Sequence, residues 1–321
     1  MAAQTLYAGP AKCYRGTAGF FAEGENGEVK FEIDQEKLAV ASAMHGHLRY
    51  QQGDVTGKIT IKPFDNWGIL AALFPPALGV SVGATPGVLV IGTKGMGNPV
   101  TNVPTSVWVP GDTRIYVATC TMVYKPPQLH LGVGKALFDG MEILCMGDPA
   151  KKVGDAGFLY TITETGAADP GGVMTMADFI RESWTAAWTG TGFTALEAEE
   201  EFTLVPEIKW NVYKVQKLTR LVKLASVRFM VKGRLIGPTH TNIDTAIGIH
   251  GGRLLGSSFG ASGTDLVLTS ASGKVITLKN ADAVGAGFEF GGSKLGTGEV
   301  GFVNAMTLTA GAAAPLLTFS A

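Results

Sequence analysis

An alternation of apolar and polar residues occurs twice near the start of the chain. Val29, Phe31 and Ile33 alternate with charged residues, and the same period of two returns over residues 55–62. This period is typical of a strand with one buried face, so each stretch predicts a strand. The polar residues between them, 43–54, predict a long loop.

A short helix is predicted to follow the second strand. Pro63 ends that strand, because proline has no N–H to donate to a sheet. Residues 67–74 are largely apolar, and Asp65 is expected to cap their first turn. Pro75 and Pro76 then end the helix.

Further short strands are predicted in the rest of the first half, where apolar runs are separated by glycine, proline and aspartate. Trp184 and Trp188 are spaced as on a helix face, but their threonine and glycine neighbours favour an extended segment. The first-half strands are expected at residues 88–91, 106–109, 114–118, 121–124, 128–132, 141–146 and 158–162.

The second half repeats this order of elements. Residues 201–205 and 222–232 match the first two strands, and an apolar segment at 243–249, capped by Thr241 or Asn242, takes the place of the helix. The repeat is much longer than that of a solenoid, so it predicts a duplicated domain; chance similarity between two β-rich halves is the alternative. Later strands are expected at residues 265–268, 274–278, 287–290 and 300–303.

The expected fold class is therefore mainly β, with two tandem β-sandwich or barrel domains, each with a short flanking α-helix. The segment 166–172, rich in glycine and small residues, is the best boundary candidate. It divides the chain into a first domain, 1–168, and a second domain, 169–321. A brief helix is also expected at 175–183.

The composition suggests a surface that becomes buried against other copies. Of the 321 residues only 17% are charged and 44 are glycine, and the mean hydropathy is +0.22. Low charge with exposed apolar surface is typical of an assembling subunit, although a merely hydrophobic monomer is the alternative. The net charge of -1 gives no electrostatic reason to expect tight binding to nucleic acid or to an anionic membrane.

Cysteine use and the start of the chain indicate a protein made in the cytosol. Cys13, Cys120 and Cys145 are odd in number and lack metal-ligand spacing, so reduced thiols are expected. Neither a signal peptide nor a stretch long and apolar enough to span a membrane is present in the sequence, so no membrane association is expected.

No motif in the sequence predicts catalysis or a cofactor. His45 and His47 flank Gly46, but no third ligand lies nearby, which favours a solvated or interface loop over a metal site. The glycine-rich segments 92–97 and 132–135 lack the ending and the helix of a phosphate-binding loop. No Ser–His–Asp order, paired carboxylates or activated cysteine is recognisable. The protein is therefore expected not to be an enzyme.

Each of two charged runs has two interpretations, one as ordinary solvated surface or subunit interface and one as a functional surface. The carboxylates at 197–201 are more typical of a solvated turn than of a surface that repels DNA. The basic residues at 209–223 alternate with Trp210 and Tyr213, a pattern compatible with nucleic-acid binding. A face between subunits is the favoured interpretation of this second run.

The order strand, long loop, strand and capped helix, and above all residues 57–75, resembles the major tail tube proteins of tailed bacteriophages. The resemblance covers the first half well and the second half only through the duplication. It implies β-sandwich or barrel domains whose sheets pair between subunits into a ring around a lumen that passes DNA. Two-domain members form trimeric rings with pseudo-sixfold symmetry, and a duplicated chain fits that type.

The same resemblance implies a site and partners. In the family the long loop packs against the neighbouring ring, which assigns that role here to His45, His47, Leu48, Arg49, Tyr50, Gln51 and Gln52. The second half has no equally polar loop, so the two halves are expected to differ in stacking. The implied partners are further copies of the chain, the tape measure protein, and the terminator and baseplate or tip proteins at the ends of the tube. Double-stranded DNA would pass without specific binding.

The leading hypothesis is thus a structural virion protein, a tail tube subunit assembled in the host cytoplasm and located in the tail, with no cofactor. One alternative is another tail component, such as a terminator, a connector or the tube of an injection machine. A ligand-binding β-sandwich module is the alternative from a different class, since the fold alone permits it.

Overall fold

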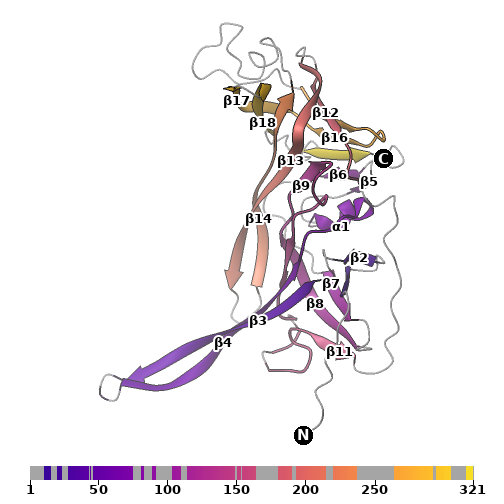
Figure 1. Cartoon of the computed structure of the whole chain (residues 1–321). Coiled ribbons are helices and arrows are strands. Elements are labelled where there is room, and N and C mark those ends of the chain that lie inside the picture. The colour runs from indigo at the N-terminus through magenta and orange to yellow at the C-terminus, as the bar shows by residue number, and fades with distance from the viewer. Residues whose placement is uncertain are drawn as a thin grey trace.

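The computed structural model of the chain consists almost entirely of β-strands in two antiparallel sheets (Figure 1). The predicted mainly β fold is confirmed. The structure describes residues 11–15, 20–23, 28–42, 44, 46–74, 81–82, 89–91, 103–109, 114–148, 150–152, 154–163, 180–189, 193–214, 220–236, 264–291, 294–304 and 316–320.

The first sheet has eight strands in the order β2-β1-β7-β8-β10-β4-β3, with β11 also paired to β8. All of its strands come from the first half of the chain. They are β1 (Lys12–Arg15), β2 (Phe20–Glu23), β3 (Val29–Ser42), β4 (Gly46–Ile61), β7 (Val103–Val109), β8 (Arg114–Lys125), β10 (Met141–Cys145) and β11 (Thr161–Thr163).

The second sheet has eleven strands in the order β17-β18-β14-β13-β12-β15-β16-β19-β6-β5, with β9 also paired to β13. Three of its strands precede residue 168, so the chain crosses between the sheets more than once. The strands are β5 (Ser81–Val82), β6 (Leu89–Ile91), β9 (Leu129–Gly132), β12 (Trp184–Trp188), β13 (Phe193–Lys214), β14 (Arg220–Ile236), β15 (Leu266–Ser270), β16 (Val275–Leu278), β17 (Ala281–Gly291), β18 (Lys294–Asn304) and β19 (Leu317–Ser320).

The helix predicted at 67–74 is present as the 3₁₀ turn η2 (Trp67–Ile69) followed by α1 (Leu70–Leu73). The predicted cap is wrong. Asp65 Oδ1 accepts a hydrogen bond from the Leu137 N–H at 2.6 Å, and Oδ2 accepts one from Arg181 Nη2 at 2.7 Å. Because both carboxylate oxygens bind other segments, Asp65 anchors the start of the helix to them instead of capping its first turn.

Several other predictions can be compared with the structure. The strands expected at 114–118 and 121–124 are one continuous strand, β8. The extended segment around Trp184 and Trp188 is confirmed as β12, and both indoles are buried. Residues 180–183, the end of the helix expected at 175–183, are not helical. The second predicted helix, 243–249, and the domain boundary near 168 lie outside the described residues.

The loop predicted at 43–54 is wrong, because strands β3 and β4 continue through it to a turn near Met44 and form one long hairpin. Strands β13 and β14 form a second long hairpin with the same register. In both hairpins the second strand carries one extra residue at the same bulge. The equivalent pairs are Val29 opposite Ile61 and Phe202 opposite Gly233; Phe31 opposite Ile59 and Leu204 opposite Val231; Gln35 opposite Val55 and Ile208 opposite Val227; Lys37 opposite Gln52 and Trp210 opposite Leu224.

The strands beside the two hairpins also correspond. The order β3-β4-β10-β8 in the first sheet is matched by β13-β14-β18-β17 in the second, with the same chain order and antiparallel pairing. Strand β8 has a bulge at Tyr124 and strand β17 has one at Val284, each next to the equivalent pair. The two four-stranded units, which we call unit 1 (β3, β4, β10, β8) and unit 2 (β13, β14, β18, β17), are therefore built alike.

Aromatic side chains around the helix join the two halves of the chain. The Phe74 ring lies 5.8 Å from that of Phe229 and 6.2 Å from that of Phe319. The Trp67 ring lies 6.1 Å from that of Trp184. These residues belong to one continuous buried cluster or pack directly on it, and the cluster contains residues of both sheets. The helix of the first half thus packs against strands of the second sheet.

Replacement of Phe74 tests this shared core. Phe74 is 2% exposed, so Phe74→Ala should lower the free energy of unfolding by about 3–5 kcal/mol, through lost burial and the cavity left behind. Equilibrium urea unfolding measures the change. Val284→Ala, at a side chain that is 55% exposed, is the control and should change it by less than about 0.5 kcal/mol. A loss below about 1 kcal/mol for Phe74→Ala would contradict the role of the helix.

Candidate functional site

The residues assigned to a loop between rings lie on strand β4, in a hairpin that projects from the body of the molecule (Figure 1). We call its outer part, residues 33–56, the arm. His45 lies outside the described residues. The other six predicted residues are in β4: Gln51, Gln52 and His47 pair with β3 through their backbones, Leu48 lies at a register shift, and Arg49 and Tyr50 pair with Val40 and Ala39.

Strand β3 of the arm is exposed on both faces, whereas Gly53 and Asp54 of β4 are buried at the bulge. Every residue of β3 from Ile33 to Ala39 is exposed, whereas Val29 and Phe31 at its root are partly buried. The large apolar side chains Leu38, Met44 and Tyr50 are 47%, 87% and 63% exposed. A two-stranded ribbon in water is marginally stable, because neither face is covered and both edges carry unpaired backbone groups. The arm therefore presents the features of a surface that a partner covers.

An apolar groove of about 570 Å³ lies at the root of the arm. Ile33 and Val55 form one side of it, and residues 154–162 form the other. The Tyr160 ring meets Phe31 edge-on at 5.3 Å, which continues the buried face of β3 into the groove. Its size is within the range of small-ligand sites, about 300–1,000 Å³, but it has few polar groups to orient a ligand.

The second hairpin differs from the arm because another part of the chain covers it at Trp210 and Val222. Trp210 and Val222, near its tip, pack against a small cluster on the outer face of the first sheet. The Trp210 indole N–H donates to the Tyr124 carbonyl oxygen at 3.0 Å, and Val222 is 3% exposed. The members from the first sheet are Cys120 and Met122 of β8, Leu144 of β10, and Met146.

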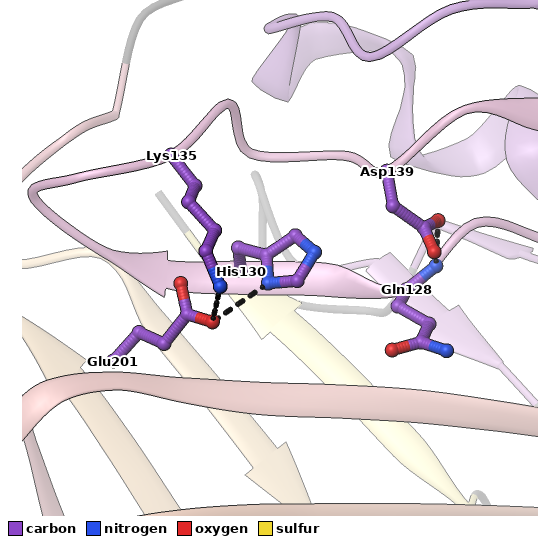
Figure 2. Close-up of polar contacts among 5 residues, drawn as sticks. All are labelled: Gln128, His130, Lys135, Asp139 and Glu201. Atoms are coloured by element: carbon purple, nitrogen blue, oxygen red, sulfur yellow. Dashed lines mark hydrogen bonds and ion pairs between the residues drawn. The ribbon is translucent and has the colours of Figure 1, made fainter.

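A polar cluster joins β9 to β13 (Figure 2). Lys135 Nζ donates to Glu201 Oε1 at 2.7 Å, and His130 Nδ1 lies 3.1 Å from the same oxygen. The hydrogen bond and the charge of Glu201 raise the pKa of the Lys135 ammonium. Glu201 is 14% exposed, so two cationic or polar partners compensate its burial. Both partners of Glu201 point to the same carboxylate oxygen, an arrangement that suits the joining of two segments of the chain.

Chemistry of other kinds has little support in the described part of the chain. Within it no group of three His, Cys, Asp or Glu side chains is placed to hold a metal ion. Burial raises the pKa of the Cys13 thiol to about 12 and that of Cys145 to about 12, which makes both poor nucleophiles at neutral pH. No described helix is long and apolar enough to span a membrane.

The two charged runs weighed from the sequence are split between environments. Of the carboxylates at 197–201, Glu197 and Glu200 are exposed while Glu201 enters the cluster with His130. Of the basic run, Lys209 is exposed and Lys223 is half-buried, and Tyr213, nearer the tip of the second hairpin, is exposed. The glycine-rich segment 92–97 lies outside the described residues.

No protein-family model and no curated protein sequence matched the chain. The inference about function therefore depends on the geometry above and on the resemblance of residues 57–75. Sequence reasoning found the arm as a polar segment but missed both the groove and the contact made by the second hairpin. The alternation at 222–232 was the available signal for the second hairpin, whereas the groove joins residues distant in sequence.

The partly buried carboxyl of Asp139, near the polar cluster, gives a pH-dependent prediction. Burial raises the pKa of Asp139, while the hydrogen bond from the Gln128 backbone N–H, 2.7 Å from Oδ1, acts in the opposite direction. The folded protein thus binds this proton more tightly than the unfolded chain. Its contribution to the free energy of unfolding falls as pH rises through the interval above the ordinary value of 3.8.

Asp139→Asn should remove this dependence and keep the acceptor for Gln128. The free energy of unfolding of the variant minus that of the wild type should therefore increase as pH rises from about 3 to about 7. Urea unfolding across that range measures this difference. Glu28→Gln, at an exposed carboxylate, is the control. Parallel stability profiles for Asp139→Asn and the wild type would contradict the prediction.

Proposed function

We propose that the protein is a structural virion protein, the major tail tube subunit of a tailed bacteriophage. Its copies form rings that stack into the hollow conduit through which DNA leaves the virion. The observation that carries the proposal is the arm: a long two-stranded ribbon with exposed apolar side chains on a chain that otherwise buries a large core. Contact with another subunit would cover it.

The repeated architecture supports the two-domain type of subunit. Units 1 and 2 share strand order, register and bulge positions, as a fused pair of tube domains would. Three such chains would place six similar units around a ring with pseudo-sixfold symmetry. Ring closure would also pair the sheet edges that remain open in the single chain.

The remaining features agree with a role without reaction chemistry. The low net charge suits a wall that DNA passes without specific binding. The polar groups of Figure 2 join strands of the same chain. On this proposal the partners are further copies, the tape measure protein inside the tube, and the terminator and baseplate or tip proteins at its ends. On the same proposal, the protein would assemble in the host cytoplasm and form part of the virion tail.

Removal of the outer arm tests the proposal. A variant in which Asn-Gly replaces residues 38–51 joins Lys37 to Gln52, which already face each other, by a tight turn. The deleted residues contribute little to the core, so the free energy of unfolding should change by less than about 1 kcal/mol. Purified wild-type protein should form tubes of uniform diameter in negative-stain electron microscopy, and the variant should form none.

Three results would change the conclusion. Tubes of normal length from the folded variant would contradict the role of the arm. Single rings that never stack, from the wild type, would favour the terminator or connector alternative. A wild-type protein that stays monomeric in gel filtration and sedimentation at high concentration would contradict the proposal as a whole.

A further inference from the structure

A contact inside the chain shows how one hairpin of this kind is covered. The hairpin β13–β14 of unit 2 lies against the outer face of β8 and β10 of unit 1. Trp210 contributes both its ring and its hydrogen bond to the Tyr124 carbonyl, and Met122 lies in the same cluster. The contact therefore joins the hairpin of one unit to the β8–β10 face of the other.

The matching register identifies the residues of the arm and of strands β17 and β18 that are equivalent to those in the contact inside the chain. Lys37 in the arm occupies the position of Trp210, and Tyr50 occupies that of Val222. Val222 is 3% exposed, but Tyr50 is 63% exposed. On β17 and β18, Asp282 takes the position of Met122, and Val303 takes that of Leu144.

We propose that the arm of one copy packs against the outer face of β17 and β18 of a second copy, repeating the contact between β13–β14 and β8–β10. This inference depends on the self-assembly proposed above. The arm and strands β17 and β18 lie at opposite ends of the folded molecule, so a molecule cannot make this contact with itself (Figure 1). Each copy offers one arm and one receiving face, a head-to-tail arrangement that propagates from subunit to subunit.

The charges at one pair of equivalent positions on the two surfaces are opposite. In the contact inside the chain, Trp210 and Met122 are both apolar. Their equivalents are a lysine in the arm, Lys37, and an aspartate on β17, Asp282. Two apolar residues of the cluster inside the subunit thus correspond to two residues of opposite charge, one on the arm and one on the receiving face. A lysine and an aspartate brought together at an interface favour the correct partner and disfavour others.

The receiving face also has apolar surface for Tyr50. Val284, the bulged residue of β17, is 55% exposed, and Val303 of β18 is partly buried. An aromatic ring with a polar tip suits a contact that is apolar at its centre and wet at its rim. The arm would then gain the cover that the second hairpin obtains within the chain.

Charge reversal at these two positions tests the proposal. Lys37→Asp and Asp282→Lys should each raise the concentration needed for assembly by about tenfold, since each places like charges together. The double variant Lys37→Asp/Asp282→Lys should restore the wild-type value. Lys152→Asp, with the same charge change at an exposed lysine outside residues 33–56 and outside strands β17 and β18, is the control and should leave this concentration unchanged. Sedimentation measures the assembly concentration, and negative-stain microscopy identifies the product.

A second pair of substitutions introduces the residue types of the contact inside the chain. It keeps the proposal testable if Asp282→Lys fails to fold. Lys37→Trp/Asp282→Met should assemble near the wild-type concentration, whereas each single variant should require more protein. Wild-type tubes together with unaffected single charge reversals would overturn this inference and leave the tube proposal standing. Impaired singles with no rescue in either double variant would also overturn it. A wild type that never assembles would overturn both.

Discussion

The instability of a two-stranded ribbon with both faces in water is the physical constraint that governs the interactions of this protein. Strand β3 is exposed on every side from Ile33 to Ala39, and the described part of the chain supplies no third strand or layer to cover it. The second hairpin has the same register but is covered, because Trp210 and Val222 rest on the outer face of the first sheet. The same hairpin architecture therefore occurs twice in the chain: β13–β14 packs against the first sheet, and the outer part of β3–β4 is exposed to solvent.

The shared core explains how an open arm can be held in a defined position. The helix after β4 places Trp67 and Phe74 against aromatic rings of the second sheet, and Asp65 binds both Arg181 and the Leu137 backbone. Strand β9 adds a further link through His130 and Glu201. These connections fix the two halves of the chain against each other, so the arm and the receiving surfaces keep their relative placement. Rigid placement reduces the entropy lost on assembly.

The sequence predicted those elements in which one face is buried. The alternation at Val29 and Phe31 and the apolar residues of the short helix follow from contact with a core. The arm was mistaken for a loop because a strand exposed on both faces has no apolar alternation to reveal it. The pairing of β9 with β13 and the alternative partners of Asp65 depend on contacts distant in sequence. The equivalence of Lys37 with Trp210 becomes visible only when the register and bulges are compared.

Hydrogen exchange of the arm backbone tests the central claim most directly. Amides of residues 34–42 and 47–54 would be compared, by mass spectrometry, in assembled protein and in subunits dissociated by dilution. The account predicts fast exchange in the dissociated subunit, where the ribbon frays, and exchange slowed by at least about tenfold in the assembly. Amides of β13–β14 should be protected in both. Equally fast exchange of the arm in both states would contradict the claim that another copy covers it.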